Sequence, residues 1–193
     1  MKSICVYCGS ANQASQEYFR AAHQMGETLA RRGLTLVYGG GKTGLMGALA
    51  GSVLDSGGEV IGVIVESMNT PELAHTRLTQ LEVTATIHQR KTRMYELADG
   101  YIALPGGYGT LDELFETLTW AQIGEHCKPV GLLNVNGYYD SLLAMLDRAL
   151  EEKFLFPEHR RALLCDSQPE ELLDAMIAFQ PPLEAVKRWM RQE

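Results

Sequence analysis

The sequence predicts one α/β domain over residues 1–193, a Rossmann-like, doubly wound parallel sheet with helices on both faces. Short, continuous apolar runs alternate with amphipathic helical patterns, which is typical of parallel strands that are covered on both sides. Glycine-rich or polar loops follow several of these runs, as expected at the carboxyl ends of parallel strands, where such sheets bind ligands. A chain of 193 residues without repeats or low-complexity tracts fits one domain with a sizeable core.

Each predicted strand is a run of apolar residues, and each predicted helix carries apolar residues on one face. Glycines mark helix ends, because Gly33 stops the first helix and Gly57-Gly58 stops the second. In chain order the sequence predicts strand 4–8, helix 18–32, strand 34–38, a helix to about residue 54, strand 60–65, strand 81–84, helix 87–98, strand 101–104, a helix from about residue 110, strand 130–135, helix 138–153, and short helices near 169–179 and 183–190.

Composition argues against several classes of protein. The net charge of −7 disfavours a nucleic-acid-binding surface, which normally carries a basic stripe. No apolar stretch approaches the roughly 20 residues of a membrane span and no signal peptide precedes the first strand, so we expect a cytoplasmic protein without membrane contacts. The five histidines are dispersed, without metal-ligand spacing. Cys5 and Cys8 lie three apart on one strand, so their thiols should point to opposite faces and not pair.

The stretch from residue 101 to residue 120 is the centre of the predicted site. Strand 101–104 leads into a glycine-rich turn over residues 105–109, and a helix then opens near Thr110. The unpaired N–H groups and the positive dipole end at a helix start suit a phosphate group. The apolar residues of this helix recur on a stripe that should face the core. That stripe comprises Leu111, Leu114, Phe115 and Leu118.

Glu113 places a carboxylate in the first turn of this helix, beside the predicted anion site. Two interpretations stay open at this point. Either Glu113 is a functional side chain, or it forms a capping box with Thr110 and only accepts a hydrogen bond from the N-cap amide.

The loop Gly39-Gly-Gly-Lys-Thr-Gly44 follows a predicted strand and opens a helix. It is not a Walker A loop, because Leu36 occupies the place of the first glycine. It matches G-x-G-x-x-G, with Glu66 at the end of the next strand, but that dinucleotide fingerprint normally follows the first strand of its unit. Three interpretations remain open, namely a tight turn with close helix packing, a phosphate or ribose contact, and an NAD site.

The segment His88-Gln-Arg-Lys91 places two cations at the unfavourable end of a helix. Thr86 and Gln89 can cap this helix, so Arg90 and Lys91 fall in its first turn and oppose the dipole by a few tenths to about 1 kcal/mol each. Arg90 shares an apolar stripe with Met94, which directs it inward. An inward guanidinium needs an anion, either a ligand or, as the structural alternative, a carboxylate of the protein.

Two motifs in fixed register give the chain a family resemblance. Pro105-Gly-Gly-Tyr-Gly-Thr-Leu-Asp-Glu113, with Arg90-Lys91 placed 23 residues before that glutamate, resembles the Lonely Guy family. These enzymes are cytokinin-activating nucleoside 5′-monophosphate phosphoribohydrolases, long mislabelled as lysine decarboxylases. The resemblance runs from Ile4 to about Phe156. It also includes Cys8-Gly-Ser10, the loop 39–44, Trp120-Ala-Gln122 and Lys128-Pro-Val-Gly-Leu-Leu-Asn134.

The resemblance implies that Arg90 and Glu113 are the catalytic pair and that the protein is a homodimer with its sites at the subunit interface. Glu72 corresponds to a family position in a loop, residues 68–75, that departs from the family pattern. Ile87 and Asp112 stand where methionine and glutamate are common. No metal or other cofactor is expected. The predicted substrate-binding residues are Ser10, Gly41, Glu72, Lys91, Met94, Gly106, Gly107, Tyr108, Gly109, Thr110 and Thr119.

The resulting hypothesis is a hydrolase that cleaves the N-glycosidic bond of purine nucleoside 5′-monophosphates, such as AMP and N6-modified cytokinin riboside monophosphates. Its products are the free base and ribose 5-phosphate. As the bond breaks, positive charge develops on the ribose, and a nearby carboxylate such as that of Glu113 stabilises this charge. The two alternatives are an NAD-dependent enzyme that uses the loop 39–44 with Glu66, and a non-catalytic nucleotide or cofactor carrier.

Overall fold

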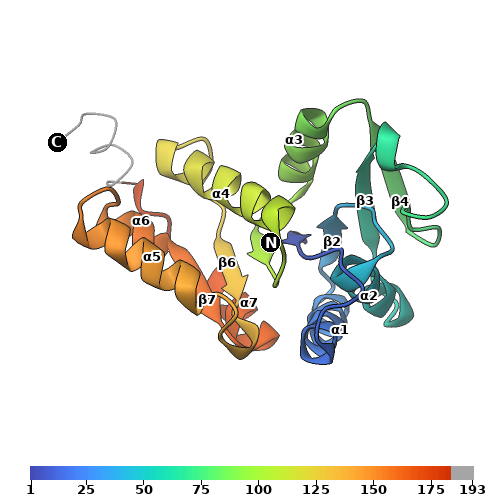
Figure 1. Ribbon diagram of the computed structural model, residues 1–193, viewed down its shortest axis with the longest axis horizontal. Coiled ribbons are helices and arrows are strands. Elements are labelled where there is room, and N and C mark those ends of the chain that lie inside the picture. The colour runs from blue at the N-terminus through green and yellow to red at the C-terminus, as the bar shows by residue number, and fades with distance from the viewer. Residues whose placement is uncertain (184–193) are drawn as a thin grey trace.

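Seven parallel strands form the sheet of the protein, in a computed structural model that describes residues 1–183 (Figure 1). The strands are β1 (Ser3–Tyr7), β2 (Thr35–Tyr38), β3 (Val60–Val65), β4 (Gln80–Thr84), β5 (Tyr101–Ala103), β6 (Val130–Leu133) and β7 (Leu163–Asp166). Their order across the sheet is β4-β3-β2-β1-β5-β6-β7, and every neighbouring pair is parallel. The predicted parallel sheet is therefore confirmed.

Helices cover both faces of this sheet (Figure 1). They are α1 (Gln16–Arg31), α2 (Gly44–Asp55), α3 (Ile87–Leu97), α4 (Tyr108–Ile123), α5 (Asp140–Glu151), α6 (Pro157–Ala162) and α7 (Pro169–Ile177), with short 3₁₀ segments η1 (Glu66–Met68) and η2 (Val135–Gly137). One core joins α1, α2 and α7 to the sheet, and a second core joins α3, α4 and α5 to its other face. This arrangement confirms the double winding.

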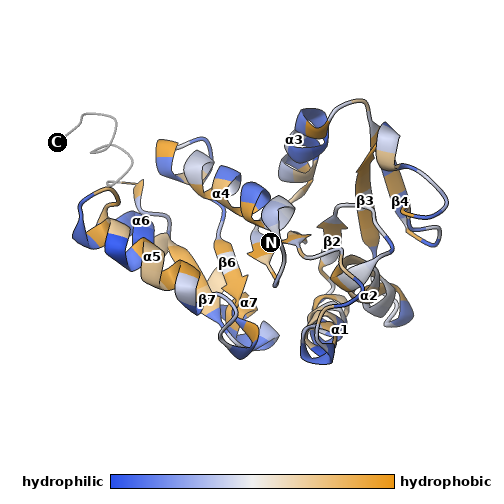
Figure 2. Cartoon of the chain, viewed as in Figure 1, coloured by the Kyte–Doolittle hydropathy of each residue, from blue (hydrophilic) through white to orange (hydrophobic). Residues whose placement is uncertain are grey.

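Apolar side chains on both faces of the strands fill these two cores, as a parallel sheet requires. Figure 2 shows β3 and β6 coloured hydrophobic along most of their length, whereas the helices also carry hydrophilic residues. Cys5 belongs to the core under α3 and α4, and Cys8 belongs to the core under α1 and α2. The prediction that these two thiols point to opposite faces is confirmed, and burial raises the pKa of both.

The order of the strands reverses between β1 and β5. From β1 the chain runs outward through β2 and β3 to the edge strand β4, and it then returns to place β5 on the other side of β1. At such a switch point the loops leaving two neighbouring strands diverge to opposite faces, which opens a crevice at the carboxyl ends. The loop after β1 and the turn after β5 therefore border the place where ligand binding is expected.

The end of the chain differs from the prediction. Helix α6 and strand β7 were not predicted, because a six-residue helix and a four-residue edge strand are too short to show a clear period. The predicted helix near residues 183–190 lies outside the described residues beyond Leu183. None of the helices between residues 1 and 183 combines the length with the apolar sequence that crossing a membrane requires.

Candidate active site

The loop after β1 and the turn after β5 lie against each other at the switch point. The Gly9 N–H donates a hydrogen bond to the Pro105 carbonyl at 3.0 Å. A Cβ at Gly9 would lie 3.3 Å from the Gly106 Cα atom, which is closer than most such contacts. The residues Cys8-Gly-Ser10 and the glycine-rich turn thus lie side by side at the carboxyl ends of β1 and β5.

The three glycines of the turn after β5 have different surroundings. A Cβ at Gly106 would lie 2.1 Å from Thr110 Oγ1 and 2.8 Å from the Gly9 nitrogen, so this glycine is required by packing. A Cβ at Gly107 or at Gly109 would meet nothing within 4 Å. Their backbones also have no positive φ. The fold of the chain therefore does not require glycine at these two positions, and a ligand that approached the turn would meet bare backbone there.

Helix α4 begins two residues earlier than predicted. Gly107 is its N-cap, and the Gly107 carbonyl accepts a hydrogen bond from the Leu111 N–H at 3.0 Å. Thr110 therefore lies inside the helix, where it is buried against Gly106. The helix thus opens two residues before Thr110, and the capping box of Thr110 with Glu113 is not formed, because Gly107 takes the cap position.

The first N–H groups of α4 have no acceptor, whereas the first two N–H groups of α2 bond to the protein. Among the described residues, the N–H groups of residues 107–110 have no hydrogen-bond acceptor. At α2, the Gly44 N–H donates to Asn12 Oδ1 at 2.8 Å and the Leu45 N–H donates to the Gly9 carbonyl at 2.9 Å. Protein groups thus occupy the place where the fingerprint of a dinucleotide site would hold a pyrophosphate.

Close packing explains the glycines of the loop 39–44. A Cβ at Gly39 would lie 2.2 Å from Arg90 Nη2. Gly41 bridges to Ala74 in the loop after β3, and Gly44 has a φ of +58° with Ser10 against it. Of the three interpretations left open by the sequence, the tight turn with close packing accounts for this loop.

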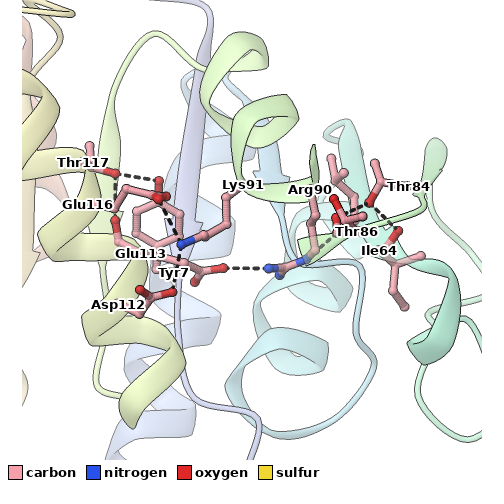
Figure 3. A network of polar contacts seen from close by, with 11 residues as sticks. Tyr7, Ile64, Thr84, Thr86, Arg90, Lys91, Asp112, Glu113, Glu116 and Thr117 are labelled. Carbon is pink, nitrogen blue, oxygen red and sulfur yellow. Dashed lines mark hydrogen bonds and ion pairs between the residues drawn. The ribbon is translucent and has the colours of Figure 1, made fainter. Parts of the chain in front are cut away.

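Arg90 faces inward and pairs with Glu113. Its helix α3 begins with the predicted capping box, in which Gln89 and Thr86 bond each other's backbone. Arg90 Nη1 lies 2.8 Å from Glu113 Oε1, and Arg90 Nε donates to the Val63 carbonyl at 2.9 Å (Figure 3). The side chains of Arg90 and Glu113 are only 12% and 13% exposed. The anion that Arg90 needs is therefore the carboxylate of the other predicted catalytic residue.

Two opposing effects act on the pKa of Glu113 in this pair. Burial raises the pKa of the Glu113 carboxyl above its ordinary value, and the neighbouring Arg90 guanidinium opposes that rise. Among the described residues no acceptor takes a hydrogen bond from Arg90 Nη2. The pair thus combines a partly desolvated carboxylate with a spare guanidinium donor, at a site where the backbone of Gly39 leaves room.

Lys91 points away from Arg90, toward α4 (Figure 3). Its Nζ atom lies 3.1 Å from Asp112 Oδ2 and 3.0 Å from Glu116 Oε1, and its side chain is 11% exposed. Burial lowers the pKa of Lys91, but the hydrogen bonds that its ammonium donates to Glu116 and Asp112 outweigh this effect and raise that pKa. In this chain Lys91 is a fully paired cation that ties α3 to α4, so its predicted contact with phosphate requires those carboxylates to release it.

Four other predicted binding residues lie at different distances from the turn. Ser10 is exposed beside Gly44, and Glu72 is exposed in the loop after β3. The Glu72 backbone and the Thr70 side chain lower the pKa of its carboxyl. Met94 is buried in the core and offers no surface to a ligand, which corrects its prediction. Thr119 is exposed near the far end of α4, about 16 Å along the helix from Tyr108.

Two tyrosines after β6 contact the turn and were not predicted. The Tyr138 hydroxyl donates to the Gly106 carbonyl and the Tyr139 hydroxyl donates to the Leu104 carbonyl, both at 2.6 Å. Their position just after a predicted strand could have indicated them as site residues, since the carboxyl edge of the sheet carries the site. Within residues 1–183, no group of three or more His, Cys, Asp or Glu side chains is placed to hold a metal ion.

The fold and this site define a Rossmann-type α/β protein with an open helix start and a buried Arg–Glu pair at the switch point. The family model described as "Possible lysine decarboxylase" matches residues 46–176. A probable cytokinin riboside 5'-monophosphate phosphoribohydrolase of Oryza sativa subsp. japonica is 47% identical over 180 residues, which cover 93% of this chain and 85% of the relative. The chain therefore belongs to the Lonely Guy family, which its sequence motifs resemble.

Further comparisons agree with this assignment. A cytokinin riboside 5'-monophosphate phosphoribohydrolase of Arabidopsis thaliana is 44% identical over 185 residues, covering 96% of this chain and 85% of the relative. Among solved structures, a molybdenum cofactor binding protein of Rippkaea orientalis superposes with a TM-score of 0.70 at 25% identity, covering 92% of this chain and 97% of that chain. The fold is thus shared by proteins whose names describe an enzyme and a binding protein.

Proposed function

We propose that the protein hydrolyses the N-glycosidic bond of purine nucleoside 5′-monophosphates, AMP and N6-modified cytokinin riboside monophosphates, to a free base and ribose 5-phosphate. The observation that carries this proposal is the buried Arg90–Glu113 pair next to the open start of α4. The relatives at 44–47% identity are named for this reaction. A site that only bound anions would gain nothing from a buried carboxylate, because like charges repel.

The 5′-phosphate binds at the start of α4 in this proposal. The free N–H groups of residues 107–110 and the positive end of the helix dipole both favour a dianion. The open space at Gly107 and Gly109 lets the phosphate reach the backbone closely. In this proposal the ribose lies toward Glu113, which is one to two turns further along the same helix.

Glu113 acts when the base departs. The ribose then gains oxocarbenium character, and a preorganised carboxylate in a partly desolvated site stabilises that positive charge and orients the attacking water. Arg90 favours the ionised form of Glu113, since its guanidinium opposes the rise that burial causes in the pKa of that carboxyl. Arg90 Nη2 remains available to the nucleotide. None of these roles uses a metal or a redox cofactor.

We further propose a homodimer in which α4 lies at the interface. Thr119 is too far along α4 to reach the turn of its own chain, and Phe115 next to it is 39% exposed. These residues also line an apolar cavity of about 140 Å³ between α4 and the segment that ends at Leu183. Light scattering on the purified protein tests the dimer, which a monomeric mass would exclude.

The cytoplasm is the proposed compartment, in keeping with cysteines that are all free.

Incubation with AMP, followed by chromatography of the products, tests the function. We expect equimolar adenine and ribose 5-phosphate, and at least about 100-fold less product from adenosine, because adenosine lacks the phosphate that the start of α4 binds. Equal turnover of AMP and adenosine would contradict the phosphate assignment. Binding of AMP without release of adenine would favour the alternative function, a non-catalytic nucleotide or cofactor carrier. The structural similarity to the molybdenum cofactor binding protein is the reason to test this alternative.

The glycines of the turn provide a second prediction. Gly107→Ala and Gly109→Ala should fold normally, and Gly109→Ala should gain up to about 1 kcal/mol of stability because alanine favours the helix. Both should bind ribose 5-phosphate at least about tenfold more weakly, since the new Cβ intrudes into open space beside the free N–H groups. Gly106→Ala should instead lose about 1–3 kcal/mol of stability, because its Cβ meets Thr110.

Thermal unfolding and titration calorimetry with ribose 5-phosphate measure these two effects separately. Gly51→Ala is a suitable control, because it also adds a Cβ to a helix in open space, but on α2 and away from the crevice. Wild-type affinity in both Gly107→Ala and Gly109→Ala would show that no ligand approaches this face of the turn.

A further inference from the structure

All the carbonyl groups of the turn after β5 bond to the protein, whereas the N–H groups that follow are free. The Leu104 carbonyl accepts from Tyr139, and the Pro105 carbonyl accepts from the Gly9 N–H. The Gly106 carbonyl accepts from Tyr138, and the Gly107 carbonyl accepts from the Leu111 N–H of α4. The acceptors of the turn are therefore taken up by protein groups while the donors that follow stay unbonded, which is the polarity that an anion requires.

We propose that Tyr138 is a positioning residue for the phosphate, an inference that rests on the proposed function. In a trans peptide the C=O and N–H groups point in opposite directions, and the chain contains no cis peptide among the described residues. By holding the Gly106 carbonyl at 2.6 Å, the Tyr138 hydroxyl therefore holds the Gly107 N–H toward the crevice. That N–H is the first of the four open donors at the start of α4.

This peptide needs such a restraint because glycines flank it. Gly106 and Gly107 lack the Cβ atoms that limit φ and ψ in other residues, so the plane between them can rotate at little cost. Rotation by half a turn would replace the Gly107 N–H with the Gly106 carbonyl and place a partial negative charge beside the phosphate. Of the four carbonyl contacts, those of Pro105 and Gly107 are made by backbone groups, and that of Leu104 restrains the strand before the turn.

Tyr138 is itself held in place. The Asn134 side chain accepts a hydrogen bond from the Tyr139 N–H at 2.7 Å and donates to Asp140 at 2.8 Å, which fixes the backbone on either side of the tyrosines. The Tyr138 ring packs edge-on against Tyr18 and Tyr139, with ring centroids at 5.6 Å and 5.0 Å. Tyr138 is 42% exposed, and these ring contacts together with the hydrogen bond to Gly106 define the position of its hydroxyl before any ligand arrives, as preorganised binding requires.

Tyr138→Phe tests this role because it removes the hydroxyl and keeps the ring contacts. We expect the variant to bind ribose 5-phosphate about tenfold more weakly than the wild type by calorimetry, which corresponds to the net loss of one hydrogen bond. The KM for AMP should rise by a similar factor, and kcat should stay within about twofold, because Arg90 and Glu113 are untouched. Binding of adenine, which carries no phosphate, should be unchanged.

Two tyrosine variants serve as matched controls. Tyr18→Phe alters the ring next to Tyr138 but removes no hydrogen bond within the described residues, so we expect wild-type affinity. Tyr139→Phe leaves the buried Leu104 carbonyl unsatisfied, so we expect a lower melting temperature with ribose 5-phosphate affinity close to that of the wild type. This contrast separates a loss of stability from a loss of positioning.

The possible outcomes distinguish the positioning role from the proposed reaction. Wild-type affinity of Tyr138→Phe for ribose 5-phosphate would overturn the positioning role while leaving the hydrolase intact. Weaker binding by Tyr138→Phe, together with no release of adenine from AMP by the wild type, would support the positioning role and exclude the hydrolase. Failure of the wild type to bind both ribose 5-phosphate and inorganic phosphate would overturn the phosphate site and the role of Tyr138 together.

Discussion

Glu113→Gln should lower kcat for AMP by about 100-fold or more while ribose 5-phosphate still binds. Glutamine has nearly the same shape and keeps a hydrogen bond to Arg90, but it lacks the negative charge that stabilises the ribose as it becomes cationic. The ground-state nucleotide has no such charge, so its affinity should change only a few-fold. Steady-state kinetics together with calorimetry on the same preparation measure both quantities.

Glu116→Gln is the matched control for this variant. It also removes a carboxylate from α4, but Glu116 contacts Lys91, which keeps a second partner in Asp112. We expect it to retain most of the wild-type kcat. If Glu113→Gln were as active as this control, the carboxylate of Glu113 would serve only to hold Arg90, and the proposed mechanism would be wrong.

Arg90→Ala should lose both stability and activity. Removing one member of a buried ion pair leaves the other charge without a partner, which costs about 3–5 kcal/mol. The same change should lower kcat/KM by orders of magnitude, because Glu113 loses the cation that favours its ionised form. Arg90→Lys should recover little, since one ammonium cannot contact Glu113 and the Val63 carbonyl with the planar geometry of a guanidinium.

A double substitution separates the two roles of Arg90. Combining Arg90→Met with Glu113→Gln removes both charges, so much of the lost stability should return while activity stays low. Arg93→Ala is the control on the same helix, because Arg93 is 39% exposed and its pairs with Glu82 and Glu96 contribute little at the surface. Near-normal turnover by an Arg90→Ala variant that is still folded would exclude Arg90 from the mechanism.

The structure changes how the stability of an Arg90 variant is interpreted. From local pattern, an inward arginine at a helix start implied either a ligand or a carboxylate of the protein as its partner, and a large loss of stability on its removal would indicate the carboxylate. In the folded chain the partner is Glu113, so a structural pair and the proposed catalytic pair are the same two residues. The melting temperature of an Arg90 variant therefore does not by itself distinguish a structural role from a catalytic one, and activity must be measured as well.

Local sequence was enough to place most strands and helices and to identify the turn after β5. The capping box of Thr86 and Gln89 follows from spacing within four residues, and the inward direction of Arg90 follows from the period of its helix. Such features depend on neighbours along the chain, so their physical causes are contained in a short segment. The parallel sheet follows in the same way from continuous apolar runs, and it puts the loops at one edge.

Contacts between distant segments decided the rest. The start of α4 at Tyr108, the bonds of the Gly44 and Leu45 N–H groups and the hydrogen bond from Tyr138 each depend on residues that are brought together only by the sheet order. The same holds for Gly106 and Gly107, two adjacent glycines that the sequence does not distinguish but whose surroundings differ. Pattern along the chain determines which segments form strands and helices, but burial, steric clash and hydrogen-bond partners across the sheet determine which groups stay open to a ligand.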